Sequence, residues 1–202
     1  MKISARTAIL LLCSFFVSVL AVSFMANRRF PVTVLGGEDS VGTWMSGVLL
    51  IFMAALCLSI SMKQRWYPWL FFTIFFLLLA LDERFMFHEQ MKERIIFSFH
   101  TIKLSRWIYE LPVIIGACLG GCLALLLWRH LLVKGRMLLP GVVVMGAASV
   151  IIDVLARGVF WEECFKLLAE LLMACILLLQ VEGDAEFLSK NNPKNSSRPP
   201  AN

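Results

Sequence analysis

The stretch LDERFMFHE, residues 81–89, follows a long apolar run that begins at Trp66. It places three carboxylates and a histidine at the end of a hydrophobic helix: Asp82, Glu83, His88 and Glu89. Ionisable groups are costly in a membrane-spanning helix, so a polar site must use or neutralise them. The stretch predicts a multi-pass membrane protein with a polar site on one side of its helical bundle.

The composition supports a membrane protein. Of the 202 residues 59% are hydrophobic and 16% are charged, well below the roughly 25% charged residues of soluble domains. One membrane domain fits this length, with no room beside it for a soluble enzyme domain. The net charge of +5 is spread over short loops, where Lys and Arg orient helices. We therefore expect the lipid bilayer as a partner, and no nucleic acid.

Six stretches are long enough to cross a hydrocarbon core of roughly 30 Å, which needs about 20 helical residues. We predict an all-α integral membrane bundle in residues 1–180 with six transmembrane helices, at about 7–26, 43–62, 66–83, 107–128, 137–156 and 160–180. The first stretch, Thr7–Ala26, is longer than the roughly 7–15 apolar residues of a signal-peptide core. It is therefore predicted to be an uncleaved span.

Two segments lie outside the predicted spans. Residues 84–106 carry apolar side chains at roughly helical spacing among many charges. They are predicted to continue the third helix outward and then to lie on the membrane surface as an amphipathic segment. Residues 181–202 turn polar and end in a stretch rich in proline, asparagine and serine. They are predicted to be a disordered tail.

The loop charges give the orientation. With the N-terminus in the cytoplasm, ten Lys and Arg residues fall on the inner side and eight on the outer side. An excess of Lys and Arg in cytoplasmic loops is typical of membrane proteins. We therefore predict a cell-membrane protein with both termini in the cytoplasm.

Small residues and cysteines suggest how the helices pack. Gly116 and Gly120 form a GxxxG pair, and the next span carries Gly141 and Gly146. Small residues let helices approach closely in lipid, which predicts contact between the spans 107–128 and 137–156. The six cysteines show no CxxC spacing, so we expect small buried hydrophobes rather than a zinc or redox site.

Because consecutive spans alternate in direction, distant polar residues come to one face of the membrane. Spans 66–83 and 137–156 end on the predicted outer side, and spans 107–128 and 160–180 begin there. The candidate polar site comprises Asp82, Glu83, His88, Glu89, Glu110, Asp153, Arg157, Glu162, Glu163, Lys166 and Glu170. The opposite ends of these spans offer no comparable acids, so the site is predicted at the outer side only.

Glu170 is the deepest of these residues. It lies nine positions beyond Trp161, about 13 Å along a helix and close to the bilayer midplane. Glu163, Lys166 and Glu170 share one helix face, which should point into the bundle. A carboxylate at that depth is expected either to pair with Lys166 or to be protonated.

The histidine of the opening stretch is harder to place. If the third helix continues outward, Asp82 and Glu89 share a stripe with Glu93 and His100, whereas His88 lies on another. Only a break in the helix near Phe85 would bring Asp82 and His88 together.

Three roles remain open. Under the first, the ion pairs Asp153–Arg157, Glu162–Lys166 and Lys166–Glu170 only hold the bundle in register. Under the second, the surplus of acids over bases forms an electronegative site that binds, senses or conducts a proton, a cation or a polar lipid headgroup. Under the third, the carboxylates with His88 or His100 hold a divalent metal in a membrane hydrolase for a lipid or envelope substrate. A structural subunit, with a membrane-protein partner, is a further alternative.

The motif Leu-Asp-Glu-x-x-x-x-His-Glu, with Glu162-Glu163-x-x-Lys166 at the start of the last span, resembles a set of uncharacterised bacterial multi-pass membrane proteins. The resemblance covers roughly residues 66–180 and implies a shared site at Asp82, Glu83, His88, Glu89, Glu162 and Glu163. It implies no known activity. Ceramidase-like membrane hydrolases share an aspartate–histidine motif but have seven spans and a later paired-histidine motif. Neither is found here, so their activity is not transferred.

Overall fold

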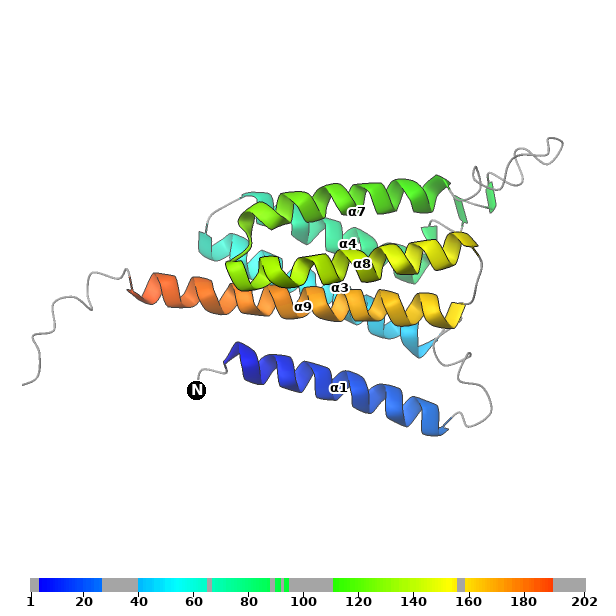
Figure 1. Ribbon diagram of the computed structural model, residues 1–202, viewed down its shortest axis with the longest axis horizontal. Coiled ribbons are helices and arrows are strands. Elements are labelled where there is room, and N and C mark those ends of the chain that lie inside the picture. The colour runs from blue at the N-terminus through cyan, green and yellow to red at the C-terminus, as the bar shows by residue number, and fades with distance from the viewer. Residues whose placement is uncertain are drawn as a thin grey trace, which may run out of the picture.

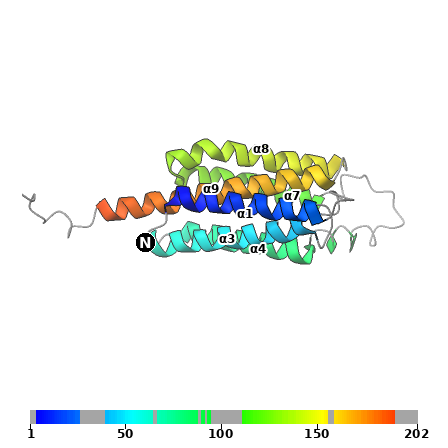
Figure 2. The same ribbon diagram turned by 90° about the horizontal axis from the view of Figure 1, so that it is seen from below.

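The computed structural model describes residues 4–26, 40–64, 67–87, 90–91, 93–94, 111–155 and 159–190. Within these ranges the chain is all-helical, as predicted. Six long helices run side by side along one bundle axis (Figure 1, Figure 2). They are α1 Ala5–Ala26, α3 Val41–Gln64, α4 Tyr67–Phe85, α7 Leu111–His130, α8 Val133–Leu155 and α9 Val159–Lys190.

Helix α9 occupies the centre of the arrangement. It packs against α8 along one side, against α3 along another, and against α1. Helix α4 packs mainly on α3, and α7 packs mainly on α8. Residues of α9 can therefore meet groups from most of the other helices.

The core follows helical periodicity. On α3 the buried apolar side chains recur every three or four residues, at Met45, Leu49, Met53, Cys57 and Ile60. On α4 they are Trp69, Phe72, Phe76 and Ala80. A helix has 3.6 residues per turn, so each set forms one stripe along its helix. Both stripes belong to the same hydrophobic core.

The outer surface of the bundle is apolar too. Each of the six helices exposes large hydrophobic side chains, including Leu10, Ile51, Leu78, Leu125, Val144 and Trp161. Soluble monomers rarely expose contiguous apolar surface on this scale, whereas a lipid-facing bundle does so over its whole circumference. Of the described helices, α1, α3, α7, α8 and α9 are long and apolar enough to cross a membrane.

Helix α4 falls outside that group although it was predicted as the third span. Its 19 residues end with Asp82, Glu83 and Arg84, so every 18-residue stretch of it contains three charges. The same residues that suggested a polar site therefore interrupt the apolar run.

The predicted outward continuation of this helix is interrupted at Met86, and most of the predicted surface segment 84–106 lies outside the described residues. Helix α4 ends at Phe85, and Met86 adopts the left-handed conformation with φ 51°. Helices commonly end on a residue of this conformation, which is usually Gly. The break lies where Asp82 and His88 would need it to meet, but His88 lies outside the described residues.

The last helix also differs from its prediction. Helix α9 runs to Lys190, so residues 181–190 are helical instead of belonging to a disordered tail. The polar side chains of this added stretch have partners on neighbouring helices, as described below, and these contacts keep the helix in register with the bundle.

The predicted contact between α7 and α8 is confirmed, but its glycines do not make it. A Cβ added at Gly116 or Gly120 would meet no atom of the described residues within 4 Å. The contact involves larger side chains near the end of α7, where Leu123 and Leu127 are buried. The face that carries Gly116 and Gly120 is open.

Candidate functional site

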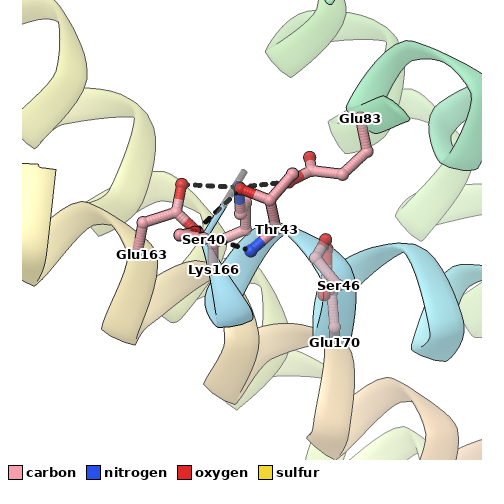
Figure 3. A network of polar contacts seen from close by, with 7 residues as sticks. All are labelled: Ser40, Thr43, Ser46, Glu83, Glu163, Lys166 and Glu170. Atoms are coloured by element: carbon pink, nitrogen blue, oxygen red, sulfur yellow. Dashed lines mark hydrogen bonds and ion pairs between the residues drawn. The ribbon is translucent and has the colours of Figure 1, made fainter. Parts of the chain in front are cut away.

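A polar cluster lies at the end of the bundle where α3 and α9 begin and α4 ends. Figure 3 shows Glu163, Lys166 and Glu170 on α9, Glu83 from α4 and Ser46 from α3. The alternation of helix directions predicted that polar residues would meet at this end of the bundle. Four residues of the predicted site lie in this cluster: Glu83, Glu163, Lys166 and Glu170.

The ammonium group of Lys166 bridges two carboxylates. Its Nζ lies 2.8 Å from Glu83 Oε1 and 2.7 Å from Glu163 Oε1. Glu163 precedes Lys166 by three residues on the same helix face, whereas Glu83 reaches across from α4. The side chains of Lys166, Glu83 and Glu163 are 24%, 14% and 10% exposed. Charge-assisted bonds in so dry a setting are among the stronger polar contacts in proteins.

Glu170 has a different partner. Ser46 Oγ donates a hydrogen bond to Glu170 Oε1 at 2.7 Å. Ser46 is fully buried on α3, and its hydroxyl group points toward α9. Burial of a polar group is costly unless it is hydrogen-bonded, and this contact satisfies one oxygen of the carboxylate.

Two carboxylate oxygens of the cluster remain without a partner. Within the described residues, Glu163 Oε2 and Glu170 Oε2 are buried and accept no hydrogen bond. Such groups are rare in native proteins and usually point to a strained group, a functional role or a bound species. The cluster thus contains three carboxylates, one ammonium group and two open acceptor atoms.

The start of α3 is fixed beside this cluster. Ser40 is buried and caps the helix: its Oγ accepts the Thr43 N–H at 3.1 Å and lies 3.0 Å from Thr43 Oγ1. A side-chain cap satisfies an amide that the first turn leaves free. Ser46 lies on the same helix, six residues after Ser40.

The predicted ion pairs were wrong in their partners. Lys166 pairs with Glu83 and Glu163 instead of Glu162 and Glu170. Spacing along α9 suggested Glu162 and Glu170 as the partners of Lys166. It could not show that the carboxylate of Glu83 on α4 comes within contact distance of Lys166.

The other predicted members divide into two groups. Asp82, Asp153 and Glu162 are half-buried near the same ends of α4, α8 and α9. His88, Glu89, Glu110 and Arg157 lie outside the described residues. The pair Asp153–Arg157 therefore stays a prediction, as do the roles of His88 and Glu89.

A second polar cluster at the opposite end of the bundle was missed. Asp184 on α9 accepts hydrogen bonds from Gln64 Nε2 at 2.7 Å and from Gln180 Nε2 at 3.1 Å. Gln180 Oε1 in turn accepts the Leu132 N–H at 2.9 Å, which fixes the connection between α7 and α8. Glu182 Oε1 accepts the Ala5 N–H at 3.0 Å and so caps α1.

The expectation that this end lacks comparable acids was therefore wrong. Glu182 and Asp184 were assigned to the tail because the apolar run ends near residue 180. Their spacing on a continuing helix, opposite Gln64 and the start of α1, was the available signal.

The geometry gives little support for a metal centre. Among the described residues no group of three or more His, Cys, Asp or Glu side chains is arranged to hold a metal ion. Glu83, Glu163, Glu170 and Lys166 instead form an acidic cluster in which the lysine pairs with two of the carboxylates.

The chain belongs to the family described as Domain of unknown function (DUF8692), which it matches over residues 4–181. The match includes the first polar cluster and all six helices in whole or in part, but it ends before Glu182 and Asp184 of the second cluster. No curated protein and no solved structure matches the chain.

Proposed function

We propose that this member of a family of unknown function is an integral membrane protein that binds a cation at one end of its helical bundle. The term cation here includes a proton, a metal ion and the amine of a lipid headgroup. The observation that carries the proposal is the pair of buried, unpartnered oxygens, Glu163 Oε2 and Glu170 Oε2, in a cluster with a single ammonium group.

Charge and burial support this role. With all groups ionised, Glu83, Glu163, Glu170 and Lys166 sum to two negative charges inside an apolar bundle. Uncompensated charges in such surroundings are expensive, and membrane proteins retain them mainly at ion and proton pathways. A bound cation would supply both the missing charge and the missing contacts to the open oxygens.

The membrane topology belongs to the same proposal. The apolar surface of all six helices supports a multi-pass location, with α4 as a sixth span beside the five apolar helices. The ten-to-eight distribution of Lys and Arg supports a cell-membrane protein with both termini in the cytoplasm. In that orientation the cation site opens toward the outer side.

A structural role is favoured by one specific observation. Lys166 links α4 to α9 through Glu83, and such a link holds a bundle together without any cargo. The metal-hydrolase alternative drew on His88 and Glu89, and no contact among the described residues favours it.

Thermal unfolding of the full chain in detergent tests the proposal. Sodium, potassium, magnesium, calcium, ethanolamine and protons are varied one at a time, with N-methylglucamine chloride holding the ionic strength constant. A ligand at about one hundred times its Kd stabilises the folded state by about 2.7 kcal/mol. One of these additions is expected to raise the melting temperature, and the double variant E163Q/E170Q should lose that response.

The opposite cluster supplies the control. Asp184→Asn makes the same kind of change in a half-buried carboxylate of α9 and should keep the response. If neither pH nor any added cation shifts the melting temperature, or if D184N and E163Q/E170Q lose the response equally, the cation site is wrong.

A further inference from the structure

The two oxygens of Glu170 have unequal surroundings. Oε1 accepts the hydroxyl proton of Ser46 at 2.7 Å, whereas Oε2 is buried and accepts no hydrogen bond from the described residues. A carboxylate with one exposed face could complete its contacts with water, but this oxygen has no such access. A proton on Oε2 removes the negative charge of Glu170 and turns the open acceptor into a neutral hydroxyl.

The nearest cation is already engaged. Lys166 lies one turn before Glu170 on the same face of α9, and its Nζ donates to Glu83 Oε1 and Glu163 Oε1. The ammonium group thus bridges the outer two carboxylates and offsets one of their two negative charges. The innermost carboxylate is left with a hydroxyl partner, which stabilises either protonation state.

The neighbouring helices contribute few other charges. Helix α3 presents the hydroxyl of Ser46, and α4 presents Glu83. Helix α8, which also packs on α9, has Asp153 near this end of the bundle. Helix α1 has Arg6, which lies at the far end, beside the Glu182 that caps the helix. No second ammonium or guanidinium group of these described helices faces Glu170.

We propose that Glu170 Oε2 is the proton-binding atom of the site, and that the cation taken up and released by this protein is the proton. The inference rests on the proposed function and narrows it. On release, the O–H bond of Glu170 breaks, the proton leaves toward the end of the bundle, and a carboxylate remains. Lys166 stays an ammonium group and lies within one turn of the new charge, so it becomes the counter-ion of Glu170 and its contact with Glu83 weakens.

Dicyclohexylcarbodiimide tests this directly, because it reacts with protonated carboxylic acids in apolar surroundings. The acid transfers its proton to one nitrogen of the reagent, and its oxygen adds to the central carbon. The adduct rearranges to a stable N-acylurea that carries the mass of the whole reagent. The full chain in detergent is treated over a series of pH values, and the labelled residue is located by peptide mass spectrometry.

The label is expected on Glu170 and not on Glu83 or Glu163, each of which binds the Lys166 ammonium group through its Oε1. Its rate should fall about tenfold per pH unit once Glu170 has ionised. E170Q should remove the label, whereas Asp184→Asn, in the polar cluster at the opposite end of the bundle, should retain it. Infrared difference spectra provide a second readout: the carbonyl stretch of a protonated acid should be present in the wild type and absent in E170Q.

Three outcomes overturn the inference. Absence of both the label and the infrared band means that Glu170 is ionised. A label whose rate is independent of pH means that the proton is never released. Suppression of the label by sodium, potassium or calcium at constant pH means that a metal ion occupies the site; in that case the proposed cation site stands, and only its assignment to the proton fails.

Discussion

Lys166 Nζ on α9 lies 2.8 Å from Glu83 Oε1 on α4, although the two residues are 83 positions apart in the chain. The two helices both pack on α3 and meet mainly through this contact. The ion pair therefore closes one end of the bundle across the start of α3. Lys166 lies at the centre of the polar cluster because it contacts carboxylates from two helices, Glu83 on α4 and Glu163 on α9.

Lys166→Met should destabilise the protein strongly. The change removes the shared partner of Glu83 and Glu163 and leaves two carboxylates in an apolar setting. Removal of one member of a buried ion pair costs about 3–5 kcal/mol, and we expect the lower end because part of the Lys166 side chain is exposed. Thermal or denaturant unfolding in detergent gives the difference.

The matched control for this change is the triple variant E83Q/E163Q/K166M. It removes the carboxylates together with the lysine, so most of the lost stability should return. A triple variant as unstable as K166M would mean that Lys166 acts through the packing of its alkyl chain and not through its charge.

Ser46→Ala should leave Glu170 Oε1 without its donor. A buried acceptor that loses its partner costs about 1–3 kcal/mol. Ser59 offers a control on the same helix: its Oγ donates to Ala55 O at 2.8 Å from an exposed position. Ser59→Ala should change the free energy of unfolding by less than about 0.5 kcal/mol. Equal effects of the two variants would contradict the buried contact between Ser46 and Glu170.

Met86→Gly should stabilise the protein. Met86 ends α4 with φ 51°, a conformation that costs about 1–2 kcal/mol for residues with a Cβ and little for glycine. The larger freedom of glycine in the unfolded chain offsets part of this gain. A higher melting temperature for M86G is expected, with Phe85→Gly, one residue earlier inside α4, as a destabilising control.

Glu182→Ala should loosen the start of α1. The Glu182 carboxylate accepts the Ala5 N–H at 3.0 Å, and loss of such a cap costs about 0.5–2 kcal/mol. Hydrogen exchange of the amides in the first turn of α1 should become faster. Asp184 contacts Gln64 and Gln180 and not α1. Asp184→Ala should therefore leave the α1 amides protected. Faster exchange of α1 in both variants would point to a general opening of α9.

Two glycines on adjacent helices should respond in opposite directions to alanine. A Cβ at Gly120 would meet no described atom within 4 Å, whereas a Cβ at Gly135 would lie 3.1 Å from Ile176 Cγ2. Gly120→Ala should therefore be neutral or stabilising by up to about 1 kcal/mol. Gly135→Ala should cost about 1–3 kcal/mol through overpacking. A large loss of stability for G120A would mean that a further chain covers the open face of α7 in solution.

The alternation of spans was enough to predict which end of the bundle carries the site. Glu83, Glu163, Lys166 and Glu170 needed only an even count of crossings to reach one end, and errors of a few residues in the helix bounds do not affect it. To predict which groups these residues contact, the rotation of each helix about its own axis must also be known. The rotation of α3 about its own axis decides that Ser46 faces Glu170, and an almost uniformly apolar helix shows little of that rotation in its sequence.

Helix ends were predicted less well than helix positions. The end of α4 at Met86 has no glycine to signal it, so the charged residues beyond it looked like a continuing helix. The extension of α9 to Lys190 depends on contacts with α1 and α3 that only the assembled bundle provides. In both cases tertiary contacts, and not local propensity, determine where the helix ends.

The cap that Glu182 places on Ala5 has a consequence for biosynthesis. The two residues lie 177 positions apart. During translation α1 is therefore synthesised long before Glu182, whose carboxylate accepts the hydrogen bond from the Ala5 N–H. Until α9 has been made, α1 lacks the helix against which it mainly packs. Helix α1 can therefore complete its packing only late in folding, after α9 has formed. A substitution at Glu182 would first destabilise the start of α1, near the other end of the chain.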